Sequence, residues 1–77
     1  MADLMRFDCR DAGAPAEQFA AVYAASARLA AERYCEQLDR PAGEYEVIVM
    51  GRGIVSVSWA FLVRCEAVPV CFAKELR

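Results

Sequence analysis

The four cysteines carry the most reactive side chains in this sequence. Cys9, Cys35, Cys65 and Cys71 include no CxxC pair, and the two nearest, Cys65 and Cys71, are six positions apart. A four-cysteine zinc site normally contains a pair about two to four residues apart, so this spacing argues against a metal site. Because no secretory signal is visible, we expect reduced, structural thiols. A redox or metal-sensing role for Cys65 and Cys71 is the alternative.

A catalytic site is hard to assemble from the other side chains. The chain has no histidine, so Ser26, Ser56, Ser58 and the thiols have no imidazole to act as general base. Glu44 and Glu46 share one face of a predicted strand but point outward into solvent, which does not prepare a carboxyl group for acid–base work. The sequence has no phosphate-binding glycine fingerprint, nucleophile elbow or RNA-recognition motif. We therefore expect a protein that is not an enzyme and that holds no cofactor or metal.

Size and charge limit the class of protein further. A chain of 77 residues forms one domain, residues 1–77, with a thin core. Nine basic and 11 acidic residues give a net charge of −2, which argues against nucleic-acid binding by bulk charge. No segment approaches the ~18 apolar residues of a membrane span, and charges occupy the N-terminal positions where a secretory signal needs an apolar stretch. We expect a cytoplasmic protein without a membrane partner.

Hydrophobic spacing in the first half of the chain predicts one strand and one long helix. Residues 4–10 alternate between apolar and polar side chains, as in a half-buried strand. Pro15 suits the first turn of a helix, and Glu17 there would complement the helix dipole. The helix is expected to end near Asp39, because Pro41 disfavours helical geometry in the residue before it. Its apolar stripe would contain Phe19, Val22, Tyr23, Ala27, Ala30, Tyr34 and Leu38.

The second half of the chain predicts three consecutive antiparallel strands. Residues 44–50 and 54–64 would form a hairpin around Gly51-Arg52-Gly53, where glycine permits a tight turn. A turn at residues 65–67 would begin the last strand, and residues 73–77 would form a short tail. The register that keeps bulky side chains on one face pairs Val49 with Val55, Val47 with Val57, Tyr45 with Trp59, Val63 with Val68, Phe61 with Val70, and Trp59 with Phe72.

These elements predict an α+β domain in the order β-α-β-β-β. One long helix would pack on a four-stranded, mostly antiparallel sheet, in a cystatin-like or split ferredoxin-like arrangement. The alanines of the helix favour close packing on a sheet, with a helix–helix seam as the alternative. Pro69 would mark the last strand as a sheet edge, because proline donates no ladder hydrogen bond. Trp59 is expected at the centre of the core.

The sheet face away from the helix is the main candidate for function. By alternation it would carry apolar side chains, including Cys71, where a solvated face would be charged. Arg52 at the hairpin tip could hold a carboxylate or phosphate of a partner, and nearby acidic residues could meet a basic surface. We expect this face to bind a protein partner or a second copy of the chain as a homodimer. The expected binding residues are Ile48, Met50, Arg52, Ile54, Leu62, Glu36, Glu44 and Glu46.

In its small size, its alanine- and arginine-rich composition, its single helix on a sheet and its lack of catalytic groups, the chain resembles phage-encoded inhibitor proteins of the anti-CRISPR kind. The resemblance covers the whole chain and rests on size and architecture. It implies a non-enzymatic protein that binds and inhibits a macromolecular partner, a protein or a nucleoprotein complex, in the cytoplasm of a bacterial host. The alternatives are a small subunit or ligand-binding module of a bacterial system and the cysteine-based sensor.

Overall fold

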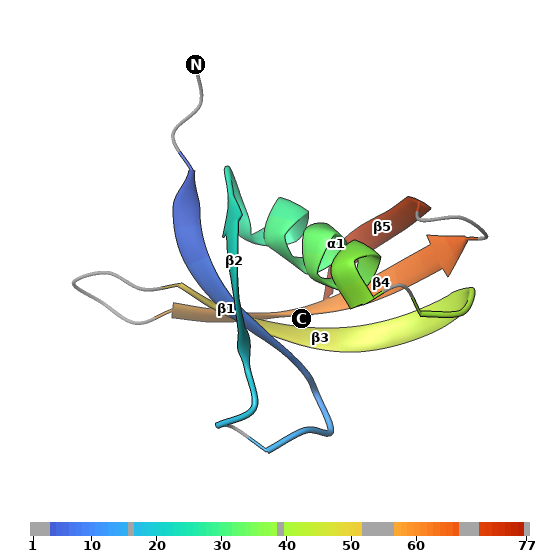
Figure 1. Ribbon diagram of the computed structural model, residues 1–77, viewed down its shortest axis with the longest axis horizontal. Helices are drawn as coiled ribbons and strands as arrows, with labels where there is room; N and C mark the ends of the chain where they lie inside the picture. The colour runs from blue at the N-terminus through green and yellow to red at the C-terminus, as the bar shows by residue number, and fades with distance from the viewer. Residues whose placement is uncertain (1–3, 16, 39, 52–56, 67–69, 77) are drawn as a thin grey trace.

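The computed structural model describes residues 4–15, 17–38, 40–51, 57–66 and 70–76 (Figure 1). The elements within them are β1 (Met5–Asp11), β2 (Ala20–Ala24), α1 (Ala27–Leu38), β3 (Gly43–Gly51), β4 (Val57–Glu66) and β5 (Val70–Leu76). The strands form one five-stranded antiparallel sheet in the order β2-β1-β3-β4-β5. The α+β class is confirmed, but the sheet has a fifth strand that the sequence did not predict.

The extra strand, β2, replaces the first half of the long helix predicted over residues 15–39. Ala20–Ala24 pairs antiparallel with β1, and α1 begins only at Ala27. Within β2, Val22 is buried and Tyr23 is exposed, which is the alternation of a strand. Alanine favours a helix locally, but pairing with β1 overrides that preference. The helix therefore does not open at Pro15 as predicted. Its cap is the hydroxyl of Ser26, which accepts a hydrogen bond of 3.3 Å from the Leu29 backbone N–H.

The β3–β4 hairpin is antiparallel as predicted, but its register differs. Val47 lies opposite Phe61 instead of Val57, and Val49 lies opposite Trp59 instead of Val55, a shift of four residues in each case. An even shift leaves every side chain on its expected face, because strand side chains alternate with a period of two. Gly51, expected in the turn, ends β3 opposite Val57, whereas Arg52, Gly53 and Ile54 lie outside the described residues.

The β4–β5 pairing reverses the faces expected for the last strand. Cys71, expected on the outer side, is buried opposite Cys65. Phe72, expected in the core, is 52% exposed. The register differs from the prediction by an odd number of residues, and such a shift exchanges the two faces. β5 also continues to Leu76, so most of the predicted tail belongs to the strand; it is a sheet edge as expected, although Pro69 lies outside the described residues.

The core lies between α1 and the sheet face that curves around it, with β2 on one side of the helix and β5 on the other (Figure 1). α1 contacts all five strands. Small helix residues such as Ala30 and Ala31, both fully buried, allow this close approach. Trp59 is only partly buried at the edge of the core, and its ring packs edge-on against Phe7 with centroids 6.2 Å apart. The buried apolar residues are Phe7, Cys9, Val22, Ala24, Ala30, Ala31, Tyr34, Cys35, Val47, Val49, Phe61, Val63, Cys65 and Cys71.

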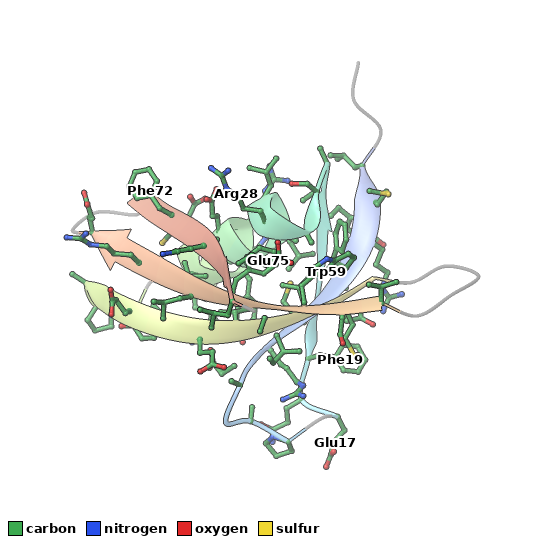
Figure 2. All side chains as sticks on the ribbon, turned by 180° about the vertical axis from the view of Figure 1, so that it is seen from behind. Glu17, Phe19, Arg28, Trp59, Phe72 and Glu75 are labelled. Carbon is green, nitrogen blue, oxygen red and sulfur yellow. The ribbon has the colours of Figure 1, made fainter. Side chains whose placement is uncertain are left out.

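The apolar stripe predicted for the long helix is divided by this arrangement. Ala30 and Tyr34 face the core, whereas Phe19, Tyr23 and Leu38 are exposed. Phe19 precedes β2 and lies on the opposite side of the sheet from Trp59 (Figure 2). In the part of the chain that the structure describes, no helix is both long and apolar enough to cross a membrane.

Candidate functional site

The sheet face opposite α1, here called the outer face, is the candidate site. On β3, β4 and β5 it is defined by Glu44, Glu46, Ile48, Met50, Ser58, Ala60, Leu62, Arg64, Phe72, Lys74 and Leu76. These residues alternate with the core residues of the same strands, so the packing of the core fixes the direction in which they point. Their positions follow from the strand register.

An apolar row crosses the middle of the outer face. The register places Ile48 opposite Ala60 and Ala60 opposite Leu76, so three neighbouring strands each contribute one apolar side chain. Leu62 on β4 and Met50 on β3 adjoin this row. All five side chains are half-buried. Cross-strand neighbours lie close enough for their side chains to contact one another, which produces a continuous apolar centre.

Charged residues of both signs adjoin the apolar row. Leu62 lies between Glu46 on β3 and Lys74 on β5, while Glu44 lies opposite Arg64. Glu44, Glu46, Arg64 and Lys74 are all exposed. An apolar centre with a polar rim is the usual composition of a protein–protein interface.

An exposed aromatic ring completes this face at its edge. Phe72 lies opposite Arg64 and projects outward from β5 (Figure 2). Sequence reasoning missed Phe72, Lys74 and Leu76 because it placed the opposite side of the last strand outward. Phe72, Lys74 and Leu76 alternate with Cys71, Ala73 and Glu75 in the sequence, but nothing local shows which set faces the helix.

Of the eight binding residues predicted from the sequence, the structure brings five together. Ile48, Met50, Leu62, Glu44 and Glu46 lie on the outer face, whereas Arg52 and Ile54 lie outside the described residues. Glu36 does not join them, because it is on α1, on the other side of the sheet, close enough to Cys71 to raise the pKa of that thiol. The acidic residues that are near one another in the sequence therefore do not form one surface.

The two edges of the sheet are engaged by neighbouring side chains of α1. Arg33 donates a hydrogen bond of 2.7 Å from Nη1 to the backbone carbonyl of Tyr23 on β2. Glu32 accepts one of 2.9 Å at Oε2 from the backbone N–H of Ala73 on β5. Edge strands present unpaired backbone groups that invite pairing with another chain. Because α1 occupies a group on each edge, the outer face is the better candidate for docking.

At β1 the outer side of the sheet is polar. Asp8, opposite Met50, is buried with 1% exposure, and its Oδ1 lies 3.3 Å from the Arg6 guanidinium. Arg10, opposite Ile48, donates a hydrogen bond of 3.0 Å from Nη1 to the Ala14 carbonyl. The apolar row is therefore bounded on this side by charged groups held in place by their own contacts.

Three thiols gather on the inner side, between α1 and the β4–β5 hairpin. Cys35 on α1 and Cys71 on β5 both interact with Cys65 on β4. Burial is the main reason why the pKa of Cys35 rises to about 11 and that of Cys71 to about 12. The neighbouring Cys65 thiol, and after it the carboxylates of Glu36 and Glu32, add to the rise in the pKa of Cys71. The thiols are thus protonated and weakly nucleophilic at neutral pH.

Two further features bear on ligand binding. Among the residues that can be placed, no group of three or more His, Cys, Asp or Glu side chains is arranged to hold a metal ion. A hollow at the ends of β3 and β4 is lined by Ala42, Glu44, Arg64 and Glu66 together with Gly43 and Cys65, and it is widely open to solvent. Small-molecule sites are mostly enclosed and apolar, so this hollow does not favour the ligand-binding alternative.

Comparison with known proteins gives no family for this arrangement. The element order does not confirm the cystatin-like or split ferredoxin-like arrangement expected from the sequence, since the sheet has five strands in the order β2-β1-β3-β4-β5. No protein-family model, no curated protein and no solved structure matches the chain.

Proposed function

We propose that this protein is a non-enzymatic binding module that docks on a protein partner through its outer face and inhibits that partner by covering the surface it occupies. The observation that carries the proposal is the apolar row of Ile48, Ala60 and Leu76, with Leu62 beside it, on the sheet face opposite α1. A chain of 77 residues has a thin core, so covering this row with a partner would bury apolar area that one chain cannot bury alone.

The rim of the outer face suggests the chemistry of the partner. Glu44 and Glu46 on β3 and Arg64 and Lys74 on β4 and β5 place charges of both signs around the apolar centre. A matching protein surface would have an apolar centre and charges of both signs at its rim, whereas a nucleic acid would need a predominantly basic surface. Phe72 is the aromatic side chain best placed to enter a pocket of the partner, because it is exposed and lies at the edge.

A second copy of the chain is one partner that this chemistry allows. A symmetric pair places the same patch on both subunits, so Glu44 and Glu46 of one copy could face Arg64 and Lys74 of the other. A homodimer and a complex with a different protein would use the same apolar row. They differ in whether the purified protein associates with itself.

The test uses a double variant on the outer face, Ile48→Glu with Leu62→Glu, and Ser58→Glu as the matched control. Ser58 is exposed on the same face of β4, so the control adds a charge without removing apolar area. Circular dichroism should show that both variants are folded. If the partner is a second copy, sedimentation velocity at micromolar concentration should show a dimer for wild type and for Ser58→Glu and a monomer for the double variant.

If wild type is a monomer, the same three proteins are immobilised and used to capture partners from the organism that encodes the chain. We expect at least one protein to be retained by wild type and Ser58→Glu and lost with the double variant, and its activity to fall when wild type is added. A monomer that captures the same proteins with and without the double substitution would show that the outer face is not the binding surface.

A further inference from the structure

Cys65 and Cys71 are direct partners across the last hairpin. The register places them opposite each other on β4 and β5, with both side chains on the inner side of the sheet. Each is almost completely buried, with 4% and 6% exposure. A disulfide between the two sulfur atoms can form without moving the backbone only if the two Cα atoms are close enough.

The hydrogen bond from Ala73 to Glu32 shows whether Cys65 and Cys71 are a hydrogen-bonded or a non-hydrogen-bonded pair of the β4–β5 ladder. The backbone N–H of Ala73 donates to Glu32, at 2.9 Å, and therefore points away from its partner Val63 on β4. Val63 and Ala73 are thus a non-hydrogen-bonded pair. Pair types alternate along an antiparallel ladder, so Cys65 and Cys71, two positions further along each strand, are a non-hydrogen-bonded pair as well.

Non-hydrogen-bonded pairs bring opposite side chains closest together. Their Cα atoms are about 4.5 Å apart, which falls within the range of roughly 4.4–6.8 Å that a disulfide spans. The contact between the two thiols agrees with this geometry. A bond between Cys65 and Cys71 therefore requires little more than a rotation of the two side chains.

We propose that Cys65 and Cys71 form a reversible cross-strand disulfide by exchange with a small-molecule disulfide of the glutathione type. One cysteine thiolate attacks a sulfur of oxidised glutathione, forms a mixed disulfide and releases one glutathione thiolate. The other cysteine thiolate attacks the protein sulfur of that mixed disulfide and releases the second glutathione. The cysteines lose two electrons and two protons, and oxidised glutathione becomes two molecules of the reduced thiol.

The bond would join the edge strand β5 covalently to β4. Among the described residues β5 pairs with β4 alone, and Glu32 contacts its other side. Cys35 lies against Cys65 from α1 and is the thiol that could compete for it. This proposal is independent of the function of the outer face, because it depends only on the inner side of the same hairpin.

The chain can be mapped by trypsin in a way that separates the possible bonds. Cleavage after Arg64 and Lys74 leaves both cysteines of the pair in one peptide, residues 65–74. Cys9 falls in residues 7–10, and Cys35 falls in residues 34–52 because trypsin does not cut before Pro41. The folded protein is incubated with oxidised glutathione at mildly alkaline pH, which offsets the raised thiol pKa values. It is then unfolded and alkylated in denaturant, so that buried thiols also react, digested and measured by mass spectrometry.

We expect peptide 65–74 to be lighter by two hydrogens and free of alkyl groups, while the peptides with Cys9 and Cys35 are alkylated. Cys65→Ala and Cys71→Ala should each abolish this product, and Cys9→Ala, a matched buried thiol, should retain it. A variant that does not fold does not affect the test, since the wild-type map decides by itself. Peptide 65–74 with two alkyl groups, with bound glutathione, or joined to residues 34–52 would overturn the proposal.

Discussion

The two faces of this sheet are built from the same strands, yet adjacent residues along a strand differ sharply in how far solvent reaches them. Phe61 is 3% exposed and packs in the core, while its neighbour Leu62 is half-buried on the outer face. On β3, Val47 and Val49 are fully buried, and Ile48 between them is not. The difference shows that side-chain type does not separate the two faces, because both contain large aliphatic residues. What separates them is that α1 covers only one.

Charged groups follow the same division. On the inner side, Arg40 forms two hydrogen bonds of 3.0 Å with the Asp11 carboxylate and stacks on Tyr45, with its guanidinium carbon 4.3 Å from the ring centroid. These contacts join the segment that follows α1 to β1 and β3. On the outer face, Glu44 and Arg64 are opposite each other but exposed. The inner charges hold elements together, and the outer charges are available to a partner.

The largest effect should come from truncating one residue on each side of β4. Phe61→Ala removes a buried ring and leaves a cavity, so the free energy of unfolding should fall by about 3–5 kcal/mol. Leu62→Ala removes a side chain that solvent reaches, and we expect a loss of about 1 kcal/mol. Urea denaturation of both variants measures the difference. Equal losses would show that the outer face is as well packed as the core.

A smaller effect is expected from the Arg40 contacts. Arg40→Ala should lower the free energy of unfolding by about 1–3 kcal/mol, because it removes two charge-assisted hydrogen bonds and a cation–π contact from a mostly buried side chain. The control is Arg28→Ala, whose ion pair with Glu32 is on the helix surface at 3.5 Å, and which should cost no more than about 0.5 kcal/mol. Thermal or urea denaturation measures the stability of both variants. A larger loss for Arg28→Ala than for Arg40→Ala would contradict the assignment of Arg40 to the inner side of the sheet.

The smallest effect is a pH dependence of the free energy of unfolding that arises from a buried thiol on the inner side of the sheet. Burial, with a contribution from Asp8, raises the pKa of Cys9 from 9.0 to about 12. Between these two values the folded protein keeps a proton that the unfolded chain has lost, so the free energy of unfolding falls as pH rises, by about 1 kcal/mol at pH 10 for this thiol. The contribution of the protonated Cys9 thiol to the free energy of unfolding is fully present below pH 9 and is lost as the pH rises toward 12.

Cys9→Ala provides the control for this effect. The variant should show a shallower loss of stability between pH 8 and 11 than wild type, whatever its stability at neutral pH, when both are followed by urea denaturation at each pH. The same slope in both proteins would mean that Cys9 ionises as readily in the folded state as in the unfolded chain. The outer face has no cysteine among its defining residues, so substitutions there should leave the slope unchanged.

Local alternation was enough to predict the faces of β3 and β4. Val47 inside and Ile48 outside follow from the period of two, whichever residue lies opposite. For the same reason the register error of four residues did not change which face any side chain of β3 or β4 was assigned to. Five of the predicted binding residues therefore lie on the outer face. The sequence could not separate competing registers, because several alignments of these valine-rich strands place bulky residues opposite one another.

The sequence by itself determined the strand character of residues 5–10, 44–50 and 57–64, the end of the helix near Leu38 and the alternation within each strand, because these depend on neighbours along the chain. Only the tertiary structure decided that Ala20–Ala24 is a strand, since its spacing suits a helix or a strand and pairing with β1 selects the latter. It also decided that Cys71 points inward and Phe72 outward. Either face of β5 could have packed on α1. The register of β5 against β4 decides which face points inward, and no local sequence pattern specifies that register.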